Sequence, residues 1–392
     1  MSDAPSPAPA PPDDGTPAAG SPPRRRRRLS RKRKLTFVAA LVALVLLCSE
    51  GVARISEWRR ASRRAARSET HYDTGVVTRG GAPVTLEPGT VQLVLDPELT
   101  FRPLPGHEAP GISINADGFR GPPLASEPGY RILLTGGSTA FGWGASADAE
   151  CVAPHLARLL SEGWGTPVEV VNAGVPSYRL ADELALVALR GLDYEPDLVV
   201  SLSGYNDLYE AFGLASGGSQ IFTQLEQQLA QAYALGPALL RATALGRRVA
   251  RGLSRVSGGL EAVEPDEVEA RYLRLARRLD ALCQGRFVLA LQPLYACHDA
   301  ATRPAAERAA LERFYARWGE RGPEFQAYLR DAVARWRGAL SDAELRWVDL
   351  SAGLGQPPGP VFEDPCHLND AGNRLLAERL AAALRDHPLA PR

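Results

Sequence analysis

From Tyr130 onward the sequence repeats one unit, a short apolar run followed by a longer stretch with helical periodicity. Five of the apolar runs have the length and composition of buried parallel strands: 131–134, 168–172, 197–202, 287–291 and 345–350. The stretches with helical periodicity are 151–161, 180–191, 264–282, 324–340 and 369–385. This alternation predicts an α/β fold, with a five-stranded parallel sheet between two helical layers in an α/β/α arrangement.

One segment interrupts the alternation. Residues 208–262 contain a Gly/Ser turn at 216–219 and otherwise have a helical pattern. The segment begins just after the carboxyl end of the third predicted strand, on the edge where sheets of this kind bind ligands. Two interpretations stay open, a surface insertion and a lid or wall of a substrate site.

The N-terminal region differs in composition from the rest of the chain. Residues 1–23 are rich in Pro, Ala, Ser and Asp, a composition that cannot bury a core. A cluster of basic residues ends at Lys34, and an uncharged apolar run begins at Leu35. A helix over 35–52 would span about 27 Å, just enough for a bilayer. The basic flank predicts that the N-terminus stays in the cytoplasm and that the following residues are exported.

We therefore expect a disordered basic cytoplasmic tail at 1–34, a single transmembrane helix at 35–52, a stalk and extended lead-in at 53–126, and the α/β domain at 127–392. The expected location is the cell membrane, crossed once, with the α/β domain periplasmic or extracellular. One alternative stays open, because small residues at 49–53 also suit the cleavage site of a signal peptide.

Charge and cysteine content limit the partners. The formal net charge is zero, and the basic cluster lies before residue 35, so the α/β domain is mildly acidic and nucleic acid is not expected as a partner.

Four cysteines lie in the part expected to be exported: Cys151, Cys283, Cys297 and Cys366. Disulfides are permitted there, and a bridge between the two that flank the fourth strand stays open. The two Cys-His dipeptides have poor spacing for a shared metal, so no metal is expected.

Polar motifs follow three of the predicted strands at the points where those strands end. Ser138 follows the first strand and two glycines, Gly174 follows the second strand, and Asn206 follows the third. Each alone has an ordinary interpretation, a turn for the glycines and a helix cap for Asn206. Because the carboxyl ends of parallel strands meet at one edge of a sheet, we expect these residues to lie close together.

A fourth motif lies after the fifth strand, where His367 follows Asp364 by three residues. A carboxylate at this spacing can reach Nδ1 of the imidazole and leave Nε2 for a nucleophile. The ordinary interpretation is a loop aspartate that caps the last helix. Together with Ser138, the pair predicts a Ser-His-Asp system that needs neither a metal nor an organic cofactor.

This ordered set of motifs resembles the SGNH (GDSL-type) hydrolase superfamily, in which four blocks supply Ser, Gly, Asn and His, with an Asp three residues before the His. The resemblance covers roughly 127–392. Residues 114–121 are also similar to a segment found ahead of the first block in membrane-anchored bacterial members. One departure is Gly137, which replaces the Asp of the usual Gly-Asp-Ser and moves the chain away from the plain lipase and esterase members.

The resemblance implies an SGNH-hydrolase, flavodoxin-like fold and two sets of site residues. The implied catalytic residues are Ser138, Asp364 and His367. The implied oxyanion hole consists of the N–H of Ser138, the N–H of Gly174 and the side-chain amide of Asn206. Tyr205 and Arg120 are further candidates for substrate contacts, with a structural tie between lead-in and core as the other interpretation of Arg120.

The implied activity is that of a serine ester hydrolase of the carboxylesterase or acetylesterase type. The expected location suggests that it removes acyl groups, most simply O-acetyl groups, from a cell-envelope or extracellular glycan, or acts on a small ester. An acyltransferase with the same triad, which moves the acyl group onto a polysaccharide, is the alternative. A third hypothesis is a non-catalytic envelope binding protein. The sequence does not indicate the oligomeric state.

Overall fold

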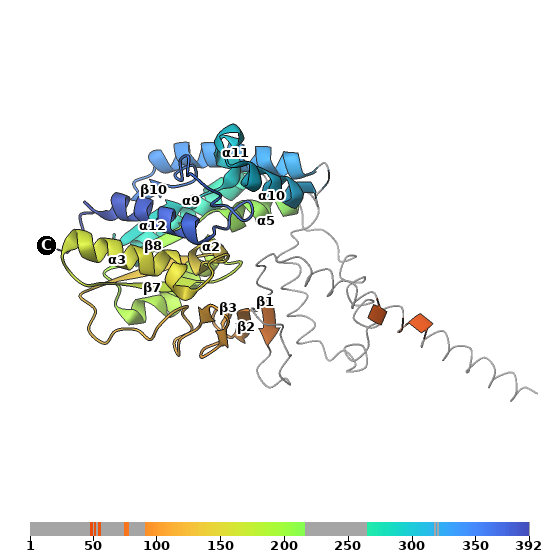
Figure 1. Cartoon of the computed structure of the whole chain (residues 1–392). Coiled ribbons are helices and arrows are strands. Elements are labelled where there is room, and N and C mark those ends of the chain that lie inside the picture. The colour runs from red at the N-terminus through yellow and green to blue at the C-terminus, as the bar shows by residue number, and fades with distance from the viewer. Residues whose placement is uncertain are drawn as a thin grey trace, which may run out of the picture.

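The computed structural model describes most of the α/β region and parts of what precedes it (Figure 1). The described residues are 48–49, 51, 54–55, 74–77, 91–215, 265–316, 319 and 321–391. The predicted tail, nearly all of the predicted transmembrane segment 35–52 and most of the insertion 208–262 lie outside them. Within the described residues, no helix is both long enough and apolar enough to cross a membrane.

A five-stranded parallel sheet forms the centre of the described chain. Its strands are β6 (Tyr130–Gly136), β7 (Val168–Gly174), β8 (Leu198–Ser203), β9 (Phe287–Leu291) and β10 (Trp347–Asp349). They lie in the order β10-β9-β8-β6-β7, and every neighbouring pair is parallel. The predicted parallel sheet is therefore confirmed, and its strand order is the flavodoxin-like one. The chain reverses its direction of winding between β6 and β8, which is where such sheets bind ligands.

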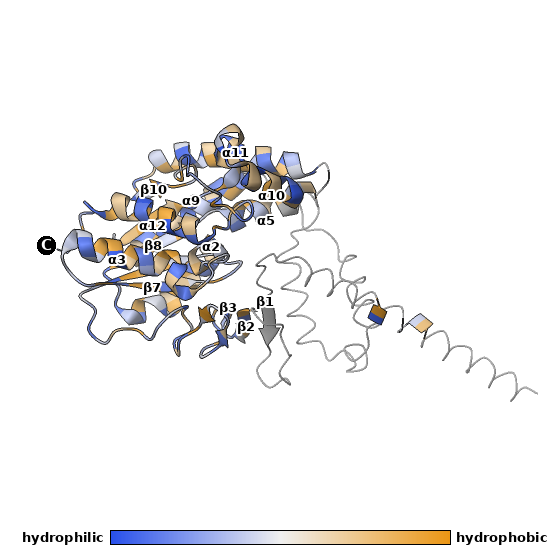
Figure 2. Cartoon of the chain, in the orientation of Figure 1, coloured by the Kyte–Doolittle hydropathy of each residue, from blue (hydrophilic) through white to orange (hydrophobic). Residues whose placement is uncertain are grey.

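Helices cover both faces of this sheet, since every residue of β8 and β9 is buried. On one side α3 (Val152–Trp164) contacts β7 and packs against α12 (Asp370–Leu384). A second group begins with α4 (Leu180–Leu189), which contacts β6, β8 and α9 (Pro265–Leu282). Figure 2 shows these helices as bands of apolar and hydrophilic residues, as expected of helices with one buried face.

Three more helices extend the second group. They are α5 (Tyr205–Ala215), α10 (Ala305–Ala316) and α11 (Arg321–Ser341), and α11 contacts α5, α9 and α10 (Figure 1). The sequence analysis did not predict α10. Its buried face contains Glu307 as well as Leu311 and Tyr315, so the apolar periodicity that predicts a helix is interrupted.

The lead-in forms small sheets beside the main one. In the first, β2 (Val91–Asp96) pairs in parallel with β1 (Thr74–Val77) and in antiparallel fashion with β3 (Thr100–Pro103). The second is the hairpin of β4 (Glu108–Ala109) and β5 (Ile112–Ser113). The N–H of Arg120 then donates to the carbonyl of Asn172 at 3.2 Å, so the lead-in pairs with β7 at the edge of the main sheet.

The cysteines in the described residues are free thiols. Cys283 and Cys297, for which a bridge was left open, therefore do not pair. They lie beyond opposite ends of β9, and a strand of that length separates its ends by roughly 16 Å. A disulfide requires Cα atoms within about 7 Å of each other.

A fully buried carboxyl lies between α4 and the sheet. Oε2 of Glu183 accepts hydrogen bonds from the hydroxyls of Thr135 on β6, at 2.7 Å, and Ser201 on β8, at 2.6 Å. Burial raises the pKa of Glu183 from 4.5 to about 7, and the hydrogen bonds offset only part of this effect. Burial likewise raises the pKa of Asp207, on α5, to about 7.

These shifts predict how stability depends on pH. Between pH 4.5 and about 7 the folded protein keeps a proton on Glu183 that the unfolded chain has lost. The free energy of unfolding should therefore fall as the pH rises through this window, and should level off above it. Glu183→Gln removes one of the two titrations and keeps an oxygen for both hydroxyls. We expect the fall to shrink by about 3 kcal/mol in denaturant unfolding at pH 4.5 and 8. An unchanged pH dependence in the variant would contradict this assignment.

Candidate active site

Ser138 is presented by a turn that only glycine permits. β6 ends at Gly136, and Ser138 is the first residue of the short helix α2 (Ser138–Phe141). Gly136 has a φ of +147°, and a Cβ at this position would lie 2.3 Å from the carbonyl oxygen of Leu202 on β8. Ser138 itself is partly exposed. It therefore lies at the carboxyl edge of the sheet, beside the point where the winding reverses.

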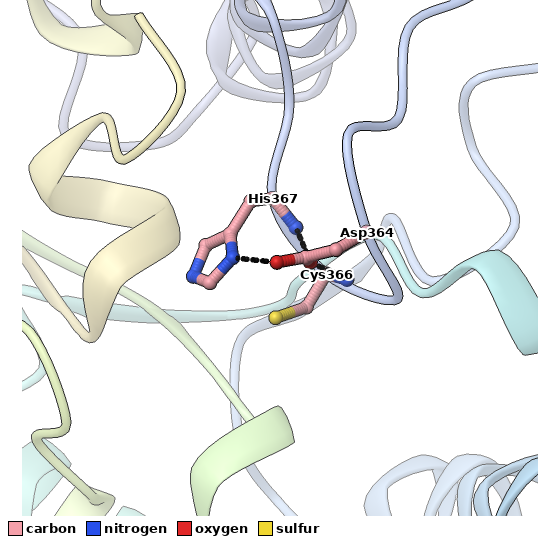
Figure 3. Close-up of side chains that lie close together, drawn as sticks. All are labelled: Asp364, Cys366 and His367. Atoms are coloured by element: carbon pink, nitrogen blue, oxygen red, sulfur yellow. Dashed lines mark hydrogen bonds and ion pairs between the residues drawn. The ribbon is translucent and has the colours of Figure 1, made fainter. Parts of the chain in front are cut away.

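Ser138, His367 and Asp364 form one chain of hydrogen bonds. Oγ of Ser138 lies 2.6 Å from Nε2 of His367, and Nδ1 of His367 lies 2.5 Å from Oδ2 of Asp364. Figure 3 shows the imidazole with Nδ1 toward the carboxylate and the other ring nitrogen turned away from it. In this arrangement the histidine can take a proton from the serine while the carboxylate fixes its orientation.

Asp364 is held in its ionised form by its own loop. Its Oδ1 accepts hydrogen bonds from the N–H groups of Cys366, at 3.0 Å, and His367, at 2.9 Å. Burial raises the pKa of Asp364, but the charge and hydrogen bond of His367 and these two backbone donors together lower it to about 2. The carboxylate is therefore charged at neutral pH and can stabilise a protonated imidazole.

A buried ion pair at the start of α10 holds the segment that precedes Asp364. Arg303 and Glu307 have fully buried side chains and lie 2.6 Å apart. Oε2 of Glu307 accepts the N–H of Val361 at 2.8 Å, and Arg303 donates to the carbonyl of Gly355 at 2.9 Å. The helix that the sequence analysis missed thus anchors the loop that carries the acid and the base.

The side-chain amide of Asn206 lies against the turn that precedes Ser138. Its Nδ2 donates to the carbonyl of Tyr178 at 2.7 Å. A Cβ on Gly137 would lie 2.5 Å from the same nitrogen, so a larger side chain at position 137 would displace the amide. The glycine at 137 therefore leaves room for this amide. Because an amide nitrogen carries two N–H groups, Asn206 can keep its bond to Tyr178 and still offer a donor near Ser138.

Gly174, which the sequence analysis expected as an oxyanion donor, lies at the end of β7 against α2. Its N–H donates to Oδ1 of Asn172 at 3.2 Å. A Cβ at this position would lie 2.2 Å from the backbone nitrogen of Phe141, so Gly174 is the residue on which α2 packs against β7. The glycine is required by this close packing, and its donor is already engaged by Asn172.

Ser177, which the sequence analysis did not single out, has an unusual backbone conformation directly before Tyr178. It is partly exposed and has a φ of 72°, in the left-handed region that non-glycine residues rarely adopt. Its N–H has no hydrogen-bond partner among the described residues. The next residue, Tyr178, is the one whose carbonyl holds the amide of Asn206. Nothing in a serine predicts a positive φ, so the sequence carries no signal for this feature.

Arg120 is buried and ties the lead-in to α2. It is 4% exposed, and its Nε donates to Oδ1 of Asp148 at 2.7 Å. Its Nη1 donates to the carbonyls of Phe141 and Gly142, at 3.2 Å and 3.0 Å, where α2 ends. These contacts agree with the structural interpretation of Arg120, and they leave its side chain buried.

Of the aromatic side chains near the site, Tyr205 is buried and Trp143 is not. Tyr205 is 6% exposed and its ring packs against those of Tyr209 and Phe325. The half-buried ring of Trp143 follows α2 and lies 6.0 Å from the imidazole of His367, at an angle of 33°. Trp143 rather than Tyr205 is therefore the aromatic wall beside the Ser-His pair.

One group of potential metal ligands occurs among the described residues, and it consists of Asp364, Cys366 and His367 (Figure 3). Their ligand atoms lie within 4.8 Å of one another. Both ring nitrogens of His367 are engaged in hydrogen bonds, one with Ser138 and one with Asp364. Burial also raises the pKa of the Cys366 thiol well above its usual value, which disfavours the thiolate that binds metals. The group is suited to proton transfer and not to metal binding.

The model of the GDSL-like lipase/acylhydrolase family matches residues 134–375 of the chain. This region begins within β6 and ends within α12, so it contains the end of β6, the other four strands of the main sheet and each residue of the Ser-His-Asp chain. A comparison with curated proteins found no match.

Several solved structures are similar to the chain at low sequence identity. A lipase/acylhydrolase from Enterococcus faecalis is 17% identical, covers 65% of this chain and 95% of its own, and has a TM-score of 0.38. A catalytic mutant of an acetylxylan esterase from Geobacillus stearothermophilus is 13% identical, covers 67% of this chain and 97% of its own, and has a TM-score of 0.39. A two-domain esterase active on acetylated mannans is 15% identical, covers 67% of this chain and 51% of its own, and has a TM-score of 0.35.

Proposed function

The chain belongs to the GDSL-like lipase/acylhydrolase family, and from this premise we propose that it is a serine ester hydrolase with Ser138 as its nucleophile. Membership of the family supports hydrolysis of esters. The observation that carries the assignment of residues is the continuous hydrogen bonding from Ser138 through His367 to Asp364, at 2.6 Å and 2.5 Å.

The proposed reaction has two halves that use the same groups. Ser138 Oγ attacks the ester carbonyl while Nε2 of His367 takes its proton, and the ionised Asp364 stabilises the imidazolium. His367 then gives the proton to the leaving alcohol, and the acyl group stays on Ser138. Water attacks the acyl-enzyme while His367 takes its proton, and His367 then returns that proton to Ser138 Oγ as the bond to the acyl group breaks and the acid is released. His367 carries every proton in this cycle, so the steps balance without a cofactor.

The negative oxygen of the tetrahedral intermediate needs donors on the other side of Ser138. We assign this role to the N–H of Ser138 and the second N–H of the Asn206 amide, with the N–H of Ser177 as a third donor in place of Gly174. The amide of Asn206 is supported by its 2.7 Å bond to Tyr178, which keeps it preorganised. Loss of one such donor typically lowers turnover by about 10²–10³-fold.

For the substrate we propose a glycan with O-acetyl or other short acyl groups. The support is the ring of Trp143 beside His367, the residue that gives its proton to the leaving alcohol. A flat aromatic surface at that place can stack against the C–H face of a sugar ring, while a few polar groups fix its orientation. In an acyltransferase that uses the same residues, a second sugar hydroxyl would replace water in the second half of the reaction.

The location is also a proposal. The apolar run at 35–52 with its basic flank supports an anchor whose N-terminus is cytoplasmic, which would place the α/β domain outside the cytoplasmic membrane among envelope glycans. Protease added outside that membrane should digest the α/β domain of the full chain in cells. Protection that persists until the membrane is dissolved would contradict the proposed topology.

Replacement of Ser138 tests the activity. Ser138→Ala should lower hydrolysis of p-nitrophenyl acetate and of an acetylated glycan by at least about 10³-fold, because no other group can form the acyl-enzyme. Ser146→Ala is the matched control, since its hydroxyl bonds Asp370 instead of His367, and it should leave the rates within about twofold. Activity retained in Ser138→Ala would refute the proposed nucleophile. Acyl transfer that depends on an added sugar acceptor would assign the protein as a transferase.

Replacement of Trp143 tests the glycan. Trp143→Ala should raise KM for the acetylated glycan about tenfold, because it removes the stacking surface for the sugar. The variant should leave KM for p-nitrophenyl acetate within about twofold, since this ester has no sugar ring. Trp143→Phe keeps an aromatic face and should recover most of the glycan binding. An equal effect of Trp143→Ala on both substrates would argue against a glycan at this surface.

A further inference from the structure

Gln292 is the first residue after β9, and its buried amide connects separate parts of the site. The side chain is 4% exposed. Its Nε2 donates to Oγ1 of Thr139 at 2.8 Å, and its Oε1 accepts the N–H of Tyr205 at 3.4 Å. The hydroxyl of Thr139 donates in turn to the carbonyl of Cys366 at 3.0 Å. These bonds link α2, the start of α5 and the loop after β10 to the end of β9.

The three residues that this network reaches share one property, because each is the immediate chain neighbour of a residue in the proposed active site. The pairs are Thr139 with Ser138, Tyr205 with Asn206, and Cys366 with His367. The backbone N–H of Gln292 also donates to the carbonyl of Ser203 at 3.0 Å, which fixes the amide at the end of β8. The network therefore connects the chain segments that carry the nucleophile, the proposed oxyanion donor and the base.

The direction of each bond is determined by its partner. The N–H of Tyr205 requires an acceptor, so it orients the amide of Gln292 with its oxygen toward α5 and its NH₂ group toward Thr139. Since the Thr139 oxygen already accepts this N–H, its single proton is directed to the carbonyl of Cys366. A buried network in which every bond has one allowed direction is rigid and holds its ends at fixed separations.

We propose that Gln292 and Thr139 are positioning residues, whose hydrogen bonds set the distance between Ser138 Oγ and His367 Nε2. This inference rests on the proposed function. It adds that a buried hydrogen-bond network holds the segments of Ser138 and His367 at the separation that the reaction needs. Small displacements matter at this point, because a misplacement of about 1 Å between reacting groups can lower the rate by about 10²-fold.

Thr135 provides a matched control for this role. It lies on β6 three residues before Ser138, is fully buried, and donates its hydroxyl to Oε2 of Glu183 at 2.7 Å. Thr135→Val and Thr139→Val therefore make the same change to a buried threonine in the same strand and turn. Only Thr139→Val breaks a bond that reaches the loop of His367.

The test measures kcat and KM for hydrolysis of p-nitrophenyl acetate by the full chain and its variants. The thermal midpoint of unfolding of each variant is measured as well. Thr139→Val and Gln292→Leu should each lower kcat about 10²-fold with KM within about twofold. Thr139→Ser, which keeps the hydroxyl, should recover most of kcat. The double variant Thr139→Val with Gln292→Leu should be no slower than either single variant, because both break one network. Thr135→Val should lower the midpoint and leave kcat within about twofold.

The labelling rate of Ser138 by an organophosphonate provides a second measurement, and it should fall in parallel with kcat. Wild-type kcat and labelling in Thr139→Val would overturn the proposal, and so would a kcat loss of the same size in Thr135→Val. If Gln292→Leu does not fold, the nearly isosteric Thr139→Val decides the question alone. Failure of the proposed function would be distinct, since Ser138→Ala would then keep wild-type activity and wild-type protein would not be labelled.

Discussion

The whole site depends on how closely the backbone of the β6–α2 turn approaches the strands on either side. A Cβ on Gly136 would lie 2.3 Å from a carbonyl of β8, and a Cβ on Gly174 would lie 2.2 Å from the backbone of α2. A Cβ on Gly137 would lie 2.5 Å from the amide of Asn206. These three contacts let a four-residue helix lie at the carboxyl edge of the sheet with Ser138 at its start.

Buried carboxyls in this protein show that burial alone does not decide the charge. Glu183 and Asp207 receive hydrogen bonds from neutral donors, and burial raises the pKa of each to about 7. Asp364 is buried too, but it faces the imidazole of His367 and accepts two backbone N–H groups, and its pKa is lowered to about 2. The charge and hydrogen bond of His367, with two backbone donors, outweigh the cost of desolvation at Asp364. The hydroxyls at Glu183 and the backbone N–H of Leu180 at Asp207 do not, so the carboxylate beside the reacting residues stays ionised.

The strands could be predicted because each is a short apolar run, and the helices because most bury an apolar stripe. Where another kind of contact fills the core, that pattern fails. α10 buries Glu307, which pairs with Arg303, and its sequence therefore lacks the expected periodicity. The same helix holds the loop that carries Asp364 and His367. An unpredicted helix therefore supports the Asp-His pair, which the sequence predicted from its spacing alone.

The sequence by itself determined the fold class, the position of each motif at the end of a strand, and the pairing of His367 with Asp364, which needs only a spacing of three residues. Tertiary structure decided the contacts of the residues around Ser138. Gly174 is used for packing, Ser177 adopts a positive φ, and Gln292 joins strands that are far apart in the chain. The physical reason is that strand and helix patterns are local, whereas a hydrogen bond between segments depends on distances that exist only after the sheet has formed.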